Sequence, residues 1–550
     1  MRPRLIVMVA TAALGLGCLV PAAGAASAQA VAAVPLGGLI AIGDLSTDAT
    51  SSYHGWNWAN PDPVYLYDDS GELEVVRYDG THDALTIDGY DPVTLQPVGA
   101  AHTVSLDGWP DWGGFYAGPD GYFYVLVGQE NPDEDDNLDV VAVRRYDQSW
   151  NLVGTAYVKG SATQGSVKGI YSPFAAGAAH MVLDGNLLVV HMGRTIYAVQ
   201  GVHHQVNLTF QVDVTTMTAT TFDELGDVSY SSHSFQQLVA MNGSDLVMVD
   251  HGDAYPREIQ LGVMAGFPSQ RAVTDYDLFD FNGAEGDNFT GASVTSLISG
   301  PQGVVVLGNS IPQPDAPSGP QGSDTQMRNA FAIAADPTTG SHHVEWLTNF
   351  DADGTTTASE LRSVQVGTDR YAVLYGVSSA TSYQLVYQLL DSSGAVLAST
   401  TFPGVFYSTI CDPVLIGHTA YWVGDEPGAG DDAPGYLYGL DVSDPSHPVL
   451  ADTERTITPT PGTFTLRHAP RLGGVFSRGS EVWVRGLRWA PTPATTVYHW
   501  YRNGRLIPGA HGGEYRLRAA DVGAALRATV TVSKPGYDTA TASTPPRTAR

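Results

Sequence analysis

The chain has 550 residues, of which 57 are Asp or Glu and 27 are Lys or Arg, and its net charge at pH 7 is −30. This charge is unevenly divided: residues 31–454 carry 11 basic and 53 acidic side chains, whereas residues 455–550 carry 14 basic and 4 acidic ones. Because an acidic body repels nucleic acids and anionic membranes, both are excluded as its partners.

The first thirty residues are predicted to be a secretory signal peptide. Arg2 and Arg4 precede an apolar stretch from Leu5 to Val20, and small residues suited to cleavage follow at 26–30. No later stretch reaches the ~18 consecutive apolar residues of a transmembrane helix. After cleavage Cys411 is the only cysteine, which excludes an intrachain disulfide. We therefore expect a secreted protein, extracellular or loosely associated with the cell surface, with no transmembrane segment.

Residues 36–450 repeat one element, a turn containing Gly or Asn followed by a short apolar strand. Copies begin at residues 118, 183, 241, 300, 366 and 415, between 49 and 66 residues apart. Strand-like runs at 64–67, 73–78 and 84–87 supply one further unit. A period near sixty with several short strands per unit is typical of β-propeller blades, which stack radially around an axis. The sequence predicts an all-β protein with a propeller of about seven blades, with six or eight as alternatives.

The densest group of side chains capable of chemistry lies within residues 203–257, in the runs 203–207, 231–235 and 250–257. Histidine and tyrosine can donate or accept protons, and the planar fork of an arginine can bind a carboxylate. The candidate catalytic residues are His233, His251, Tyr255 and Arg257, and the candidate ligand-binding residues are His204, Gln205, Asn207 and Asp253. A purely structural role is the alternative, in which Asp253 caps backbone amides in a turn between blades and Arg257 pairs with an acidic neighbour.

The metal content is left open by the sequence. His203 and His204 would point to opposite faces of a strand, so they do not form a zinc site together. Calcium fits an acidic exported protein better. Oxygen donors for it are present at 133–136 with Asp139, and at 351–354, although neither run completes a recognised calcium loop. No metal ligand is therefore assigned.

Residues 451–470 are rich in Pro and Thr and are predicted to be an extended linker, and residues 471–545 a small β-sandwich. The alternation in 526–532 fits a half-buried strand. The runs 498–510, 514–523 and 526–532 resemble the bacterial Ig-like module of secreted actinobacterial surface proteins, with Trp500 as its core residue. The resemblance covers about 70 residues from Phe476 onward. It implies a spacer or an adhesive domain without chemistry of its own.

The acidic body resembles, more loosely, large secreted Gram-positive proteins with β-propeller-like bodies. The runs that carry this resemblance are 202–210, 232–237, 250–257 and 346–349. It implies a propeller-type body with a common site, and it says nothing about substrate.

Two functions are consistent with these observations. The first is a secreted protein whose propeller binds an extracellular or cell-envelope glycan, such as a cell-wall polymer, with the Ig-like module as spacer. The second is a polysaccharide lyase, or less readily a glycoside hydrolase, acting on an anionic polysaccharide. In a lyase, Arg or His would neutralise a uronate carboxylate while Tyr or His moves the α-proton. The enzyme hypothesis requires His233, His251, Tyr255 and Arg257 to converge in one pocket.

Overall fold

The computed structural model describes residues 41–44, 61–80, 83–175, 177–225, 231–269, 272–285, 287, 289–312, 327–351, 354–380, 382–425, 434–450, 464–490, 495–533 and 539–550. The predicted signal peptide and most of the predicted linker lie outside these residues. The described residues form an all-β protein, as predicted, with two short 3-10 turns, η2 (Asp223–Leu225) and η3 (Ala519–Asp521). No helix in this part of the chain is long and apolar enough to cross a membrane.

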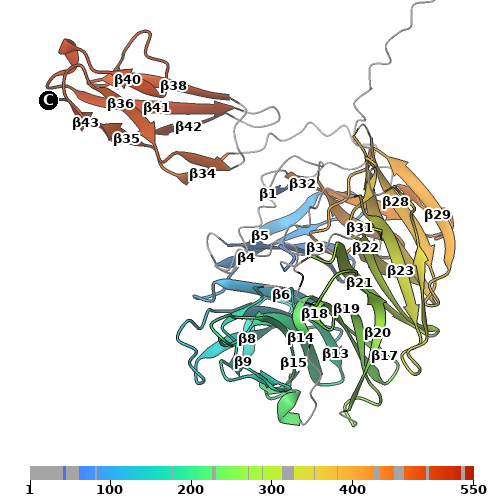
Figure 1. Cartoon of the computed structure of the whole chain (residues 1–550). Helices are drawn as coiled ribbons and strands as arrows, with labels where there is room; N and C mark the ends of the chain where they lie inside the picture. The colour runs from blue at the N-terminus through green and yellow to red at the C-terminus, as the bar shows by residue number, and fades with distance from the viewer. Residues whose placement is uncertain are drawn as a thin grey trace, which may run out of the picture. The chain divides into compact units, whose positions relative to one another are not determined.

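The body is a succession of antiparallel sheets in chain order (Figure 1). The first comprises β2 (Val64–Asp69), β3 (Glu72–Asp79), β4 (Ala84–Tyr90) and β5 (Pro97–Ser105), and the second β6 (Asp111–Ala117), β7 (Phe123–Gly128), β8 (Asp139–Tyr146) and β9 (Leu152–Lys159). A hairpin of β10 (Thr163–Gln164) and β11 (Val167–Lys168) follows.

A nine-stranded sheet comes next. Its first half consists of β12 (Ser172–Pro173), β13 (His180–Asp184), β14 (Leu187–Thr195), β15 (Gln205–Asp213) and β16 (Thr218–Thr221). Its second half consists of β17 (Ser232–Asn242), β18 (Asp245–Tyr255), β19 (Glu258–Met264) and β20 (Val273–Asp280). The two halves are joined by a single residue pair, Val206 of β15 with Ser232 of β17.

Three more sheets complete the body. They comprise β21 (Ala292–Gly300), β22 (Gly303–Ser310), β23 (Asn329–Ala335) and β24 (His342–Trp346); then β25 (Thr357–Ala358), β26 (Arg362–Gly367), β27 (Arg370–Ser378), β28 (Tyr383–Leu390) and β29 (Val396–Pro403); then β30 (Val414–Ile416), β31 (Thr419–Gly424), β32 (Pro434–Asp441) and β33 (Val449–Leu450). The last sheet also contains β1 (Ala41–Asp44), which pairs with β32.

The repeated turn–strand element corresponds to one strand in each unit, namely β7, β14, β18, β22, β27 and β31. These strands are buried along almost their whole length. A strand covered on both faces requires a continuous apolar run, which is why this element is so visible in the sequence. Buried side chains connect each sheet to the next along the chain. The first and last sheets also share a core, where Val75 lies with Val423 and Leu437.

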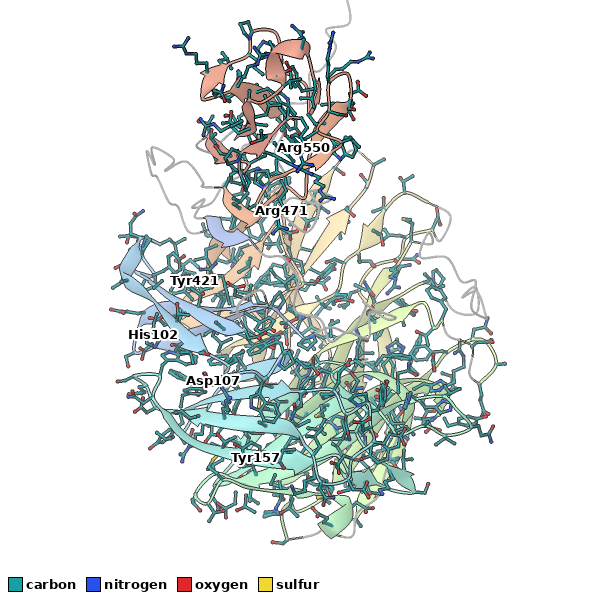
Figure 2. All side chains as sticks on the ribbon, turned by 90° about the vertical axis from the view of Figure 1, so that its left-hand side faces the viewer. His102, Asp107, Tyr157, Tyr421, Arg471 and Arg550 are labelled. Atoms are coloured by element: carbon teal, nitrogen blue, oxygen red, sulfur yellow. The ribbon has the colours of Figure 1, made fainter. Side chains whose placement is uncertain are left out.

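The C-terminal residues form separate sheets. β34 (Thr465–His468) pairs with β37 (Arg488–Ala490); β35 (Arg471–Gly474), β36 (Glu481–Arg485) and β40 (Glu514–Arg516) form a second sheet; and β39 (Arg505–Leu506), β38 (Thr495–Arg502), β41 (Ala525–Ser533), β42 (Ala540–Ser543) and β43 (Arg547–Thr548) form a third. Strand β34 lies within the segment predicted as linker. Trp500 is fully buried and shares a core with Tyr515 and Leu526. Many side chains of these C-terminal residues are basic, among them Arg471 of β35 and the terminal Arg550 (Figure 2).

Candidate functional site

Polar side chains are buried where β14, β15, β17 and β18 lie together in the nine-stranded sheet. Strand β18 is buried from Leu246 to Ala254, so its polar residues lie in the interior. The start of β17 is irregular: the pairing with β18 shifts register on both sides of Ser234, and His233 has a left-handed φ of 55°. Around this irregularity Ser231 bonds to Asn207 of β15, and the side chains of His233 and Ser234 bond to Asp253 and Asp250 of β18.

The first part of the site is a chain of three side chains, which we call the relay: Asp253, His233 and His204. His233 Nδ1 lies 3.0 Å from the Asp253 carboxylate, and His233 Nε2 lies 2.9 Å from His204 Nδ1. With Asp253 ionised, His233 donates to it from Nδ1 and accepts at Nε2 the proton of His204 Nδ1. This arrangement leaves a lone pair on His204 Nε2. The relay therefore leads from a fully buried carboxylate to a partly exposed imidazole.

Burial governs the electrostatics of the relay. It raises the pKa of Asp253, an effect that the neighbouring His233 and Arg257 oppose. Burial also lowers the pKa of His204, and the nearby His233 lowers it further because two imidazolium charges repel each other. His204 is therefore a neutral imidazole near pH 7, the form that can accept a proton.

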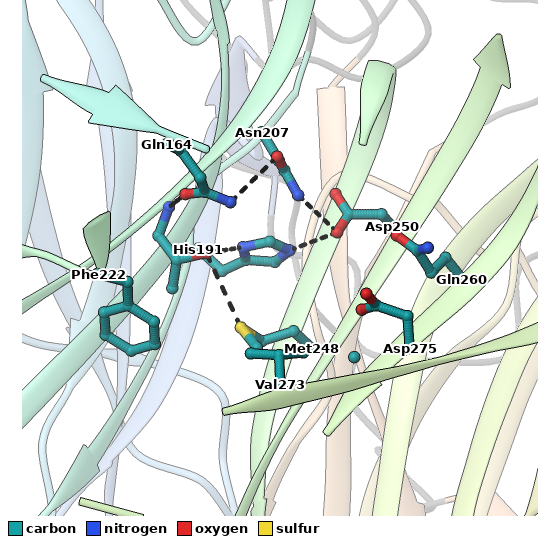
Figure 3. Close-up of a pocket in the computed structure, with 11 residues that line it drawn as sticks. Gln164, His191, Asn207, Phe222, Met248, Asp250, Gln260, Val273 and Asp275 are labelled. Carbon is teal, nitrogen blue, oxygen red and sulfur yellow. Dashed lines mark hydrogen bonds and ion pairs between the residues drawn. The ribbon is translucent and has the colours of Figure 1, made fainter. Parts of the chain in front are cut away.

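The second part of the site is a narrow polar pocket (Figure 3). His191 and Asp250 lie on its floor with 3.2 Å between His191 Nε2 and Asp250 Oδ2, and His191 Nδ1 lies 2.9 Å from Thr209 Oγ1. Asn207 donates to Asp250 over 2.8 Å and accepts a bond from Gln164 over 3.2 Å. The pocket encloses about 20 Å³, which is room for one water molecule. A sugar ring does not fit into it.

The relay and the pocket belong to one hydrogen-bond network. Asn207 Oδ1 accepts the backbone N–H of Ser231 over 3.1 Å, and the Ser234 hydroxyl donates to Asp250 over 2.6 Å. Ser231 and Ser234 flank His233 in the chain. The polar pocket thus fixes the segment that carries the central imidazole of the relay.

His251 lies away from the relay, contrary to the expected convergence. Its Nδ1 is 3.0 Å from Gln236 Oε1, its Nε2 is 2.8 Å from Thr290 Oγ1, and its ring packs against Phe281. Burial, with the positive charges of Arg328 and Arg257, lowers the pKa of His251 to about 3. His251 is therefore enclosed, with both ring nitrogens engaged by Gln236 and Thr290, and it does not join the other candidate residues in one pocket.

Arg257 also has a different role from the one expected. Its guanidinium donates to the backbone carbonyls of Asp253, Asn282, Asp287 and Phe289 over 2.6 to 3.1 Å. These bonds engage all three guanidinium nitrogens of Arg257, so no pair of N–H groups is left to bind a substrate carboxylate. The alternative of pairing with an acidic side chain is wrong as well, because the acceptors are main-chain oxygens. Arg257 instead holds the loop between β20 and β21 against the end of β18.

The remaining predicted residues lie near the relay or the pocket. Tyr255 is 60% exposed, is paired in register with Ser232, and follows Asp253 by two residues. Gln205 is buried at the start of β15 opposite Thr195. His203 and His204 separate as expected: His203 donates to the Ile196 carbonyl over 2.8 Å and stacks on Tyr171. The structure therefore brings His204, His233 and Asp253 together, places the exposed Tyr255 two residues after Asp253 on β18, and leaves His251 and Arg257 outside the relay.

Sequence reasoning missed His191 and Gln164 on the pocket. His191 interrupts the apolar run 187–192 of β14, and a histidine inside such a run is the one signal that could have indicated a buried polar partner. Gln164 lies in a short hairpin that gives no signal in the sequence.

The predicted calcium runs do not gather into a metal centre within the described residues, where no group of three or more His, Cys, Asp or Glu side chains could hold a metal. In the first run Asp136 pairs with Lys168 and Asp139 with Lys159, over 2.7 and 2.9 Å. Residues 352–353 of the second run lie outside the described residues.

Comparisons with known proteins give little further information. No protein-family model and no curated protein matches the chain. An ulvan lyase of a polysaccharide lyase family is 9% identical over 74% of this chain and 94% of its own, with a TM-score of 0.38. A prolyl oligopeptidase B from Galerina marginata is 8% identical over 88% of this chain and 57% of its own, with a TM-score of 0.38. A lignostilbene dioxygenase from Pseudomonas brassicacearum is 11% identical over 60% and 69%, with a TM-score of 0.34. Similarities this weak carry no argument about function.

Proposed function

We propose that the protein is exported and that its body is a closed propeller of seven blades. Five body sheets and the two halves of the nine-stranded sheet make seven units in the described residues. The core shared by the first and last sheets and the pairing of β1 with β32 support closure, because both join the two ends of the body. The C-terminal sheets are proposed to form an Ig-like sandwich that acts as spacer. An experimental structure with an open seam between β1 and β32 would refute the closed ring.

The proposed function of the body is to bind an extracellular glycan at the surface around Tyr255 and His204. The observation that carries this proposal is that Tyr255, 60% exposed, follows the relay residue Asp253 by two positions on β18, since an exposed aromatic side chain near polar hydrogen-bonding groups suits a sugar. The hydrogen-bond network beneath holds this surface in one arrangement, which lowers the entropy cost of binding. A neutral glycan fits better than an anionic one, because the body is acidic and Arg257 is fully engaged.

A glycan array probed with the intact protein tests this proposal. We expect binding to neutral polysaccharides that falls at least tenfold in Tyr255→Ala and in His204→Ala. Tyr157→Ala removes another exposed tyrosine, 48% exposed on β9, and should leave binding unchanged. If the intact protein binds no glycan, or if the three variants behave alike, the proposed site is wrong.

The four residues first expected to form an enzyme site do not converge, but the relay favours a different catalytic group and with it a second candidate function, proton transfer on a bound polysaccharide by a lyase or a hydrolase. A buried carboxylate that orients one imidazole, which in turn orients a second, is suited to general-base catalysis at His204 Nε2. Asp253 would act as a positioning residue because it cannot reach a substrate. The anionic substrate expected of a lyase is less well supported, since no described cation beside the relay is free to neutralise a uronate.

This candidate is tested by incubating the protein with uronate polymers and neutral glycans. New ultraviolet absorbance reports the unsaturated products of a lyase, and new reducing ends report hydrolysis. Activity should disappear in His204→Gln, and in Asp253→Asn the pH profile should shift as well as the rate. Activity that survives His204→Gln would exclude the relay as the catalyst.

A further inference from the structure

One face of the sheet β35–β36–β40 carries an exposed tryptophan among arginines, outside the site proposed on the body. Alternate residues of these strands, such as Leu472, Val482 and Tyr515, point into the core. The residues between them point outward and are exposed. These outward residues, which we call the arginine–tryptophan face, are Arg471, Glu481, Trp483, Arg485, Glu514 and Arg516. Register places Arg471 beside Arg485, and Trp483 beside Glu514.

Trp483 is held in a fixed orientation on this face. A side chain at Gly473 would come within 2.7 Å of the indole Nε1, and one at Gly474 within 3.0 Å of Cζ3. The indole therefore lies over a stretch of backbone that has no side chains, and Trp483 remains 42% exposed. An indole held in this way offers a flat apolar surface on which the C–H face of a sugar ring can stack.

A groove of about 410 Å³ lies beside this face along β40. Its lining includes His511, Arg516 and Arg518, and also Glu514, which is the register partner of Trp483. The groove and the arginine–tryptophan face are therefore contiguous. The Nε of Arg516 donates to the Gly479 carbonyl over 3.1 Å, which orients this side chain and leaves its terminal nitrogens available. The groove is within the range of ~300–1,000 Å³ typical of ligand sites.

Some arginines of the C-terminal residues are engaged by other side chains, and some are not. Arg502 pairs with Asp521, and Arg527 and Arg547 lie over aromatic rings. In the described part of the chain, by contrast, no carboxylate lies within ion-pair distance of Arg518 or of the arginines of the arginine–tryptophan face. These side chains keep their fork geometry for an external anion.

We propose that the arginine–tryptophan face and its groove bind an anionic polysaccharide. Trp483 would stack on a sugar ring, and Arg485, Arg516 and Arg518 would pair with carboxylate or phosphate groups along the polymer. The charge of residues 455–550 complements such a polymer, since 14 basic side chains outnumber 4 acidic ones. The protein then carries two surfaces of different selectivity, a basic one here and the acidic one on the body.

A polysaccharide fits this face better than a nucleic acid does. Glu481 and Glu514 are interspersed with the arginines, and they would repel the closely spaced phosphates of a nucleic acid. Sugar hydroxyls, in contrast, can donate hydrogen bonds to these carboxylates while the charged groups of the polymer pair with the arginines. Cations, carboxylates and an indole on one face therefore match a ligand with both hydroxyl and anionic groups.

The test measures binding of the full-length protein to polygalacturonate, to a phosphomannan, to neutral galactan and to single-stranded DNA. We expect at least one of the two anionic glycan-type polymers to bind, and the stronger one identifies the preferred anionic group. Trp483→Ala should weaken that binding at least tenfold, and Trp483→Phe should weaken it less. The double variant R516Q/R518Q should weaken binding and reduce its dependence on salt.

Arg505→Gln is the matched control, because it removes one exposed positive charge on β39, outside this face, and should change binding by less than twofold. Equal binding of neutral galactan or DNA, or equal loss in Arg505→Gln, would overturn the proposal, and so would unchanged affinity in Trp483→Ala. Tyr255→Ala and His204→Ala on the body should leave this binding intact. The two sets of variants therefore distinguish a failure of the proposed body site from a failure of the arginine–tryptophan face.

Discussion

His251 should make folding stability sensitive to acid, although it takes no part in proton exchange. Its pKa is lowered to about 3 in the folded protein, first by burial and then by the charges of Arg328 and Arg257, whereas an unfolded histidine titrates near 6.5. A depressed pKa means that the unfolded chain binds the proton first. Stability is therefore complete above pH ~6.5 and is lost as the pH falls toward 3. Each pH unit below 6.5 costs about 1.4 kcal/mol, so at pH 5 the loss from His251 is about 2 kcal/mol.

The measurement is the free energy of unfolding of the body at pH 7.5 and pH 5, from urea titrations followed by tryptophan fluorescence. His251→Gln retains one hydrogen-bonding side chain at this position and removes the titration. We expect it to be less stable than the wild type at pH 7.5, but its decline between the two pH values should be smaller by about 2 kcal/mol. His102→Gln, an exposed substitution on β5, is the control and should decline as the wild type does. Parallel declines of wild type and His251→Gln would refute the assignment of His251 as a buried neutral side chain.

Three further predictions concern other side chains of the body. Arg257→Met should lower the free energy of unfolding of the body by about 3 kcal/mol in the same urea assay, because buried carbonyl groups lose their hydrogen-bond donor. If the variant lost glycan affinity while its free energy of unfolding stayed unchanged, this structural role would be contradicted. In NMR titrations the pKa of His204 should lie below the usual range of a histidine, because of burial and the nearby His233. His233→Gln should raise the pKa of His204, because it removes the repelling charge. An unchanged pKa of His204 in this variant would argue against contact between the two rings. Arg362→Met should destabilise the body by about 3 kcal/mol, because it leaves the largely buried Asp62, before the first sheet, without its ion-pair partner and also removes the pair with the exposed Asp412, before the last sheet. A loss below about 1 kcal/mol would contradict this role.

The all-β fold could be predicted because its signal is repeated. Each unit contains one strand covered on both faces, and such a strand needs an apolar run like that of β22, Gly303–Ser310, whatever the loops around it contain. The joining of two units into a nine-stranded sheet could not be predicted. It depends on one residue pair, Val206 with Ser232, and on the left-handed backbone of His233, neither of which leaves a pattern in the sequence.

The sequence indicated the segment in which these polar side chains lie, but it could not predict which of them contact one another. Strand alternation cannot predict which way a polar side chain points where register shifts, as it does on both sides of Ser234. The sequence therefore could not predict that Asp253 contacts His233, whereas His251, two residues away, contacts Gln236 and Thr290. The role of Arg257 depends on carbonyls from the loop after β20, and the position of a backbone carbonyl depends on the fold and not on residue type.

The same junction explains why polar residues accumulate here. Strands β15 and β17 exchange only one pair, so backbone groups and side chains around the junction lack regular ladder partners and must find others. Asn207 bonds to the backbone of Ser231 and to Asp250, and Asp250 in turn accepts from Ser234. A network required by the fold thus holds the partly exposed His204 at its outer end, so that ordering this side chain costs little further entropy. In the proposed glycan-binding site, the polar interior accordingly serves as support, and contact with the ligand falls to the few side chains that reach the surface.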